Sequence, residues 1–201
     1  MMKFLLSAGM LAASTAFAAP AAVGQPAPAF SVTDTSGKAV SLADFKGKTV
    51  VLEWVNPGCP YVRKHYDSAN MQATQKGAAG QGVAWLAVNS TAQDHYDYKK
   101  PADMAAWMQS QKAAATHTLM DSDGKIGKAY GARTTPHLYI VDAKGTLAYA
   151  GGIDDKPSAN PADVKTAKNY VNAALADVLA GKTVAQATTR PYGCSVKYSD
   201  G

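Results

Sequence analysis

The chain has 201 residues, of which 47% are hydrophobic, and it carries a formal net charge of +5 at pH 7 and two cysteines. Two cysteines exclude a small fold built on several disulfides, and the length suits one domain with its own hydrophobic core. The lysines are scattered and form no basic run interleaved with aromatic residues. We therefore expect no nucleic-acid partner.

The N-terminus has the pattern of a secretory signal peptide. Residues 1–18 combine Lys3, an apolar run, and Ala16 and Ala18 at the spacing of a cleavage site. We expect this segment to be removed and the mature chain, residues 19–201, to begin at Ala19. The short basic start is typical of bacterial export, which predicts a periplasmic or secreted protein with no membrane segment after cleavage. The alternative is an uncleaved membrane anchor.

The first half of the mature chain predicts a hairpin and then a strand that leads into a helix. Residues 30–42 alternate around a Ser-Gly turn, and residues 49–55 are almost all β-branched or apolar, as in a strand covered on both faces. Pro60 favours a helix start, where its missing N–H is tolerated. The spacing of apolar residues predicts that this helix buries Val62, Tyr66, Ala69 and Ala73.

The second half predicts the rest of one sheet and its helices. Residues 82–88 read as a buried strand, and a helix opened by Pro101 presents Met104, Trp107 and Met108 on one face. A short strand near 117–120, a helical turn over 124–131 and a hairpin over 136–152 follow.

The last predicted helix begins at Asn160, which can cap it, has Pro161 in its first position, and ends before Gly181. Its core face is expected to hold Val164, Ala167, Val171, Ala174, Leu175, Val178 and Leu179. The order β-α-β-α-β-β-α after the hairpin predicts an α/β protein with a mixed sheet and helices on both faces.

Several stretches resemble the redoxin proteins, the alkyl-hydroperoxide-reductase and thiol-specific-antioxidant branch of the thioredoxin-like superfamily. Residues 23–60 are similar to the start of that domain and residues 130–155 to its second half, while "NPGCPYVRKHY", "GGIDD" and "PYGCSVKY" resemble a secreted bacterial subgroup. The resemblance spans residues 23–198. It implies a thioredoxin-like fold, with a central mixed β-sheet flanked by helices, an N-terminal β-hairpin and a C-terminal tail from about residue 182.

Cys59 is the main catalytic candidate because it stands at the predicted start of a helix. Unpaired N–H groups and the positive end of the helix dipole stabilise a thiolate there, and Arg63 and Lys64 would add positive charge if they folded back. The alternative is a buried cysteine that acts as a small hydrophobic residue. The flanking Pro-Gly turn and Pro60 make burial the weaker interpretation, so we expect Cys59 to be the nucleophile.

The resemblance implies a geometry around this cysteine. Thioredoxin-like oxidoreductases carry Cys-x-x-Cys where the central strand enters a helix, and the segment Cys59-Pro60-Tyr61-Val62 keeps only the first cysteine. A cis-proline faces the nucleophile in that family, and Thr135-Pro136 matches it. We therefore expect Pro60, Thr135 and Pro136 to face the substrate.

Glu53 is a charged residue within an apolar strand, and such side chains are almost never buried without a partner or a role. A desolvated carboxylate has a raised pKa and suits proton transfer. The resemblance adds that Glu53 lies six residues before Cys59, the place of a proton-moving carboxylate in thioredoxins. The alternative, a carboxylate at an edge or paired with a lysine, stays open.

Cys194 lies 13 residues beyond Gly181, so the tail can span roughly 40 Å and reach Cys59. Two cysteines in an oxidising compartment tend to pair where geometry permits. The pair is either a permanent staple or, in the favoured interpretation, a redox couple in which Cys194 resolves oxidised Cys59.

Three functions are compatible with these residues. Peroxiredoxins hold the peroxide with Pro-x-x-x-Thr-x-x-Cys and a distant arginine, and those places are taken here by Leu52, by Val55 and Asn56, and by Pro136. We therefore expect a thiol-dependent oxidoreductase that exchanges with a disulfide protein or a small thiol. A thiol peroxidase acting on a hydroperoxide is the first alternative, and a binding module with a structural disulfide is the second.

A metal site is not expected. His65 and His137 stand near the motif residues, but copper sites on this fold use a second cysteine close to the first, which the segment after Cys59 lacks. No other cofactor is indicated by the sequence.

Overall fold

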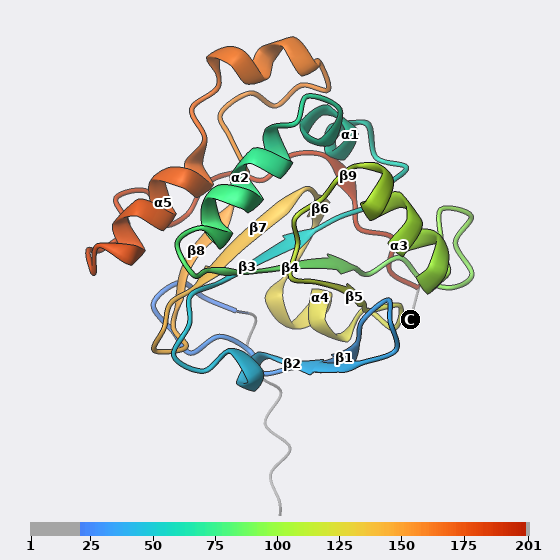
Figure 1. Ribbon diagram of the computed structural model, residues 1–201, viewed down its shortest axis with the longest axis horizontal. Coiled ribbons are helices and arrows are strands. Elements are labelled where there is room, and N and C mark those ends of the chain that lie inside the picture. The colour runs from blue at the N-terminus through green and yellow to red at the C-terminus, as the bar shows by residue number, and fades with distance from the viewer. Residues whose placement is uncertain (1–20, 200–201) are drawn as a thin grey trace, which may run out of the picture.

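The computed structural model describes residues 21–199, so the predicted signal peptide lies outside the described residues. A five-stranded sheet with the order β5-β4-β3-β7-β8 forms the centre (Figure 1). Strands β3, β4 and β5 are parallel, whereas β7 and β8 are antiparallel to their neighbours. These strands are β3 (Val50–Trp54), β4 (Ala84–Asn89), β5 (His117–Met120), β7 (His137–Val141) and β8 (Leu147–Gly151). The predicted mixed α/β sheet is confirmed.

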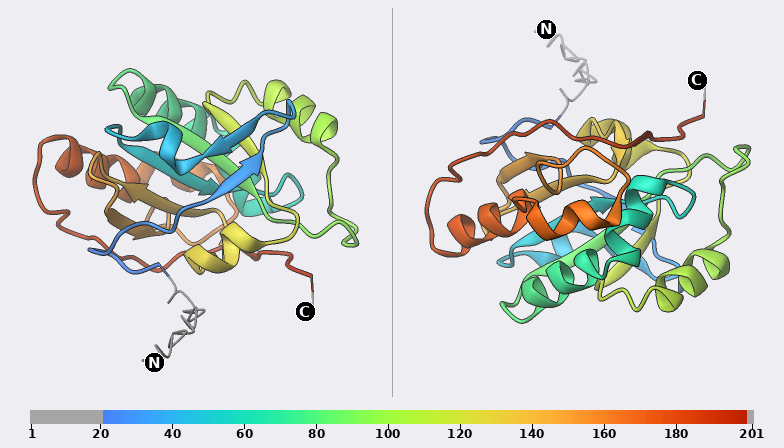
Figure 2. Two further views of the ribbon diagram at one scale, coloured as in Figure 1. Left: turned by 90° about the horizontal axis from the view of Figure 1, so that it is seen from below. Right: turned by 90° about the horizontal axis from the view of Figure 1, so that it is seen from above.

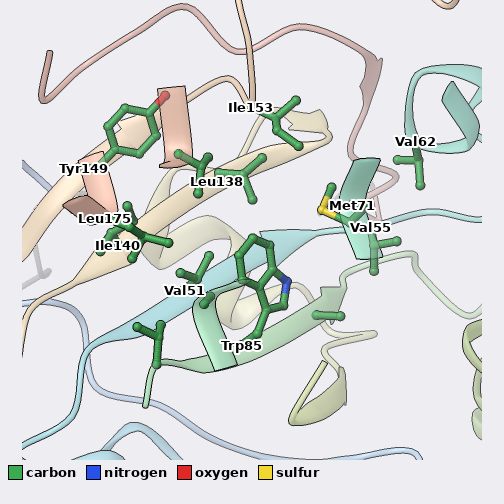
Figure 3. Close-up of a cluster of buried hydrophobic side chains, with 14 of the residues drawn as sticks. Val51, Val55, Val62, Met71, Trp85, Leu138, Ile140, Tyr149, Ile153 and Leu175 are labelled. Atoms are coloured by element: carbon green, nitrogen blue, oxygen red, sulfur yellow. The ribbon is translucent and has the colours of Figure 1, made fainter. Parts of the chain in front are cut away.

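Helices cover both faces of this sheet because its central strands are apolar on both sides. Val51 and Val55 face one cluster of buried side chains, while Leu52 and Trp54 face another. The first cluster also receives residues of α1 (Pro60–Asp67), α2 (Asn70–Ala79), α3 (Pro101–Ser110) and α5 (Tyr170–Leu179). Figure 3 shows side chains of this cluster, with Trp85 at its centre.

The opposite face is covered by shorter elements. These are α4 (Lys125–Tyr130), the predicted hairpin of β1 (Ser31–Thr33) and β2 (Ala39–Ser41), and the 3-10 helix η1 (Leu42–Phe45). Figure 1 shows α4 and the hairpin on the side of the sheet opposite α1 and α2. Within residues 21–199, no helix is long and apolar enough to span a bilayer.

The helix predicted from Pro60 is two helices, and its buried face differs from the prediction beyond Tyr66. Ala69 adopts a left-handed conformation with φ 60°, which ends α1 and turns α2 relative to it. Ala69 and Ala73 are therefore exposed, whereas Met71 is buried. Gln72 compensates for the break, since its amide donates a hydrogen bond to the Tyr66 carbonyl over 2.9 Å.

The predicted C-terminal helix is also interrupted. Asn160 caps only the 3-10 helix η2 (Pro161–Thr166), through a bond from the Ala162 N–H. The chain then extends, and a second cap at Asn169 begins α5 by accepting from the Asn172 N–H. The prediction of one helix is wrong because two capping residues stand in the same stretch. Leu179, predicted to be in the core, is 39% exposed.

The tail, residues 182–199, crosses the molecule after α5. Figure 2 shows it running from the end of α5 to the side of α4. On the way it forms β9 (Cys194–Ser195), which pairs antiparallel with β6 (Thr134–Thr135). Val184 packs on the first cluster and Val196 on the second, so the tail passes from one face of the sheet to the other.

Candidate functional site

Cys59 is the N-cap residue of α1, five residues after β3 ends at Trp54, and the helix begins at Pro60 as predicted. Its thiol donates a hydrogen bond to the Thr135 carbonyl over 3.0 Å. The side chain is only 2% exposed, so the expectation that Cys59 would not be buried is wrong. The sequence pattern missed this burial because the covering residues come from the distant tail.

Cys194 is the residue that covers it. The two sulfur atoms are 2.9 Å apart, and Cys194 itself is partly buried. The prediction that the tail can return to Cys59 is confirmed. Burial, together with the hydrogen bond to Cys59, raises the pKa of the Cys194 thiol. Cys194 is therefore a weak source of thiolate in this closed arrangement.

The peptide bond between Thr135 and Pro136 is cis, as the resemblance implied. Both residues are buried beneath the tail, because Cys194 lies opposite Thr135 in the β6–β9 pairing. Gly193 makes this approach possible. It has φ 135°, and a Cβ atom there would lie 2.0 Å from the Thr135 oxygen. The tail thus occupies the position in front of Thr135 and Pro136, while Pro60 remains exposed.

Glu53 is fully buried on β3, and three side chains donate hydrogen bonds to it. Trp85 donates over 2.7 Å and Gln75 over 3.1 Å to one carboxylate oxygen, and Tyr66 donates over 2.9 Å to the other. Burial raises its pKa to about 7, and the hydrogen bonds oppose this rise. Among residues 21–199 no lysine pairs with Glu53, so the alternative of a lysine-paired carboxylate is wrong.

These contacts also define what Glu53 does not touch. Within the described residues it shares the first cluster's side of the sheet with Cys59 but forms no hydrogen bond to either cysteine. A proton that moves between Glu53 and Cys59 therefore needs an intervening group. A carboxyl group with a pKa near neutrality can both accept and release such a proton.

The basic residues of α1 do not fold back on Cys59. Arg63 forms an exposed ion pair with Asp67 over 3.7 Å. Lys64 is buried instead and lies 3.7 Å from Asp154, in a polar cluster with His65 and Tyr192. Sequence reasoning missed this cluster, although its members belong to the three stretches "NPGCPYVRKHY", "GGIDD" and "PYGCSVKY".

The second histidine considered for a metal lies in β7. His137 is buried, with its Nδ1 within 3.3 Å of the Arg133 N–H and 3.1 Å of the Tyr139 hydroxyl. Burial lowers the pKa of His137 to about 3. No group of three metal-ligating side chains occurs among residues 21–199.

Comparison with known proteins finds relatives whose names describe thiol–disulfide exchange. The chain is 28% identical over 132 residues to the thiol-disulfide oxidoreductase ResA of Bacillus thuringiensis, a match that covers 62% of this chain and 66% of that relative. It is 27% identical over 142 residues to the thiol:disulfide interchange protein DsbE of Yersinia pestis, covering 68% of each. The chain thus spans about two thirds of the length of these curated relatives.

Among solved structures, an uncharacterized conserved protein from Geobacillus kaustophilus superposes with a TM-score of 0.78 at 26% identity. That match covers 96% of this chain and all of the other, so it includes the tail as well as the sheet. The AhpC/TSA family model matches residues 23–150, which is more than half of the chain. The chain therefore belongs to the AhpC/TSA family and has the thioredoxin-like fold that the sequence predicted.

Proposed function

We propose that this protein is an exported thiol–disulfide oxidoreductase in which Cys59 is the nucleophile and Cys194 the resolving partner. The observation that carries the proposal is the contact of the two sulfur atoms at 2.9 Å, at the start of α1 and beside the cis bond before Pro136. The names of the ResA and DsbE relatives support exchange between thiols and disulfides as the reaction class. The signal-like N-terminus supports export to the periplasm or beyond.

The proposed reaction has two steps. The Cys59 thiolate attacks one sulfur of a substrate disulfide, forms a mixed disulfide and releases the other sulfur as a thiolate. Cys194 then attacks the Cys59 sulfur and releases the second substrate thiol, so that the substrate is reduced and the pair is oxidised. Glu53 accepts or supplies a proton during this exchange, through an intervening group.

A thiol peroxidase is the second candidate, because the AhpC in the family's name denotes an alkyl hydroperoxide reductase. The region that would carry the peroxide-holding threonine contains Val55 and Asn56, and the Asn56 side chain accepts a hydrogen bond from the Gly58 N–H over 2.8 Å. Pro136 takes the place of the arginine. The protein groups that would stabilise a departing oxygen are therefore replaced.

Oxidation of the reduced protein, followed by mass spectrometry, tests the proposal. Oxidised glutathione should convert the wild type to an intramolecular Cys59–Cys194 disulfide, faster than hydrogen peroxide does. Cys194→Ser should stop at a glutathione adduct on Cys59, whereas Cys59→Ser, which keeps only Cys194, should form its glutathione adduct much more slowly. Wild-type reactivity of Cys59→Ser would refute the assignment of the nucleophile, and faster oxidation by peroxide would favour the peroxidase.

A further inference from the structure

The stretches "NPGCPYVRKHY", "GGIDD" and "PYGCSVKY" contribute side chains to one buried polar cluster. The chemistry proposed for Cys59 does not by itself give this cluster a role. Lys64 and His65 come from α1, Asp154 follows β8, and Tyr192 belongs to the tail. The side chains of Lys64 and His65 are 0% exposed and that of Asp154 is 1% exposed. Ionisable groups are rarely buried to this extent without a partner or a role.

The Tyr192 hydroxyl is the common partner of the other three side chains. It donates a short hydrogen bond to Asp154 and lies 3.1 Å from the His65 Nε2 and 3.4 Å from the Lys64 Nζ. The Asn70 amide nitrogen is 2.9 Å from the His65 Nδ1 and donates to it, which leaves the proton on Nε2 to be donated to Tyr192. Burial lowers the pKa of His65 to about 4, so this neutral form is present at pH 7.

The remaining contacts of the cluster tie it to the rest of the domain. The Lys64 Nζ donates to the Lys156 carbonyl over 2.7 Å, and the Lys156 N–H donates to Asp154 over 2.9 Å. One Asp154 oxygen has no hydrogen-bond partner in the described part of the chain and is 3.7 Å from the Lys64 Nζ. Replacing a buried ion pair with apolar residues is often neutral or stabilising, so overall stability alone explains this arrangement poorly. What these contacts do provide is a fixed orientation for the Tyr192 side chain.

The orientation of Tyr192 also determines the position of Cys194. Gly193 is the only residue between Tyr192 and Cys194, and it presses against the Thr135 carbonyl where no side chain fits. A phenol fixed in the cluster therefore fixes the sulfur two residues later. On the other side of Cys194, the Val196 N–H donates to the Arg133 carbonyl over 3.0 Å, and the Tyr198 hydroxyl donates to the Ala132 carbonyl over 2.8 Å.

We propose that Tyr192, held by Lys64, His65 and Asp154, is a positioning residue that returns Cys194 to Cys59 after a substrate has displaced the tail. The proposal rests on the proposed function, in which Cys194 resolves a mixed disulfide. An incoming sulfur on Cys59 must displace Cys194, because the two sulfur atoms are in contact and Cys59 is 2% exposed. The rate of resolution then depends on how often the tail docks again, and the Tyr192 hydroxyl favours docking.

The two steps can be measured separately with dithiobis(nitrobenzoate), an aromatic disulfide that releases a coloured thiolate. Attack by Cys59 releases one equivalent and leaves a mixed disulfide, and attack by Cys194 on the Cys59 sulfur releases the second. Tyr192→Phe removes only the hydroxyl and leaves three buried polar groups short of a partner. It should slow release of the second equivalent about tenfold, without slowing the first.

Tyr198→Phe is the matched control, because it removes a hydroxyl from the same tail that bonds to a single backbone carbonyl. It should change the second phase by no more than about threefold, the effect of one ordinary hydrogen bond. Gly193→Ala is the second variant, since it disturbs tail docking without changing any side chain of the cluster. It should slow the second phase as Tyr192→Phe does, and it keeps the test valid if Tyr192→Phe fails to fold.

The wild type treated with a single equivalent of the reagent separates the two proposals, with Cys194→Ser, which has one thiol, as the reference for a reaction that stops at the mixed disulfide. The wild type should release two equivalents, and a wild type that stops at one would refute the proposed function itself. If the wild type releases two equivalents and Tyr192→Phe resolves at the same rate, the positioning role of Tyr192 is refuted and the proposed function stands. An equal slowing of both phases by Tyr192→Phe would also refute it, because a generally weakened fold would then explain the result.

Discussion

Glu53→Gln is expected to remove a pH dependence of stability that the wild type owes to this one carboxyl group. Burial raises the pKa of Glu53 from 4.5 to about 7. Between these two values the folded state holds a proton that the unfolded state has lost, so the free energy of unfolding falls as the pH rises. A pKa change of this size corresponds to about 3 kcal/mol, since a factor of ten in proton affinity is worth about 1.4 kcal/mol.

The variant also carries a penalty that does not depend on pH. A glutamine oxygen at this position can accept from Trp85 and Gln75, but its NH2 group then faces the Tyr66 hydroxyl, whose O–H loses the acceptor that Glu53 provides. The lost hydrogen bond costs about 1–3 kcal/mol. Because the penalty is constant, it cancels when the difference between the two proteins is compared across pH.

Urea unfolding of both proteins from pH 4 to pH 8, followed by tryptophan fluorescence, measures this difference. Both proteins should carry Cys59→Ser, so that no disulfide can form between Cys59 and Cys194. The wild-type Glu53 protein should lose about 3 kcal/mol relative to the glutamine variant between pH 4.5 and 7.5, since all other ionisable groups are shared. A difference that stays constant over this range would refute the argument that burial controls the Glu53 proton.

Three further predictions concern processing and reactivity. Protein exported by a bacterial host should begin at Ala19, and N-terminal sequencing that finds Met1 in a periplasmic extract would contradict cleavage. Alkylation of the reduced protein at pH 6 to 7 should label Cys59 before Cys194, because burial and the Cys59 contact raise the pKa of Cys194; equal rates would contradict this order of reactivity. Glu53→Gln should slow reaction of the Cys59–Cys194 disulfide with a small thiol, and an unchanged rate would leave Glu53 a structural role only.

Much of the fold could be predicted because local and long-range signals agree. The apolar run of β3 is typical of a buried strand, and the proline at the start of α1 is typical of a helix start. The family resemblance predicted the cis peptide bond before Pro136. The breaks at Ala69 and Asn169 could not be predicted from spacing, because both lie in stretches whose apolar residues continue at helical intervals. Tertiary contacts decided these positions.

The site was predicted less completely, for a physical reason. Charged residues on a helix usually face water, so Lys64 gave no sign of burial. Its partners Asp154 and Tyr192 lie 90 and 128 residues further along the chain. The signal that could have found the cluster was the joint occurrence of the three resemblance stretches, because residues that accompany a reactive cysteine often support it in space.

The central claim is that the contact of Cys59 and Cys194 is exchangeable, and native-state reduction tests it most directly. The oxidised protein should be treated with increasing thiol while tryptophan fluorescence reports folding and mass spectrometry of alkylated cysteines reports the bond. We predict that the Cys59–Cys194 disulfide opens while the domain stays folded, and that it forms again under mild oxidation. A bond that opens only together with global unfolding would contradict this account and identify a structural staple, whose loss costs about 2–5 kcal/mol.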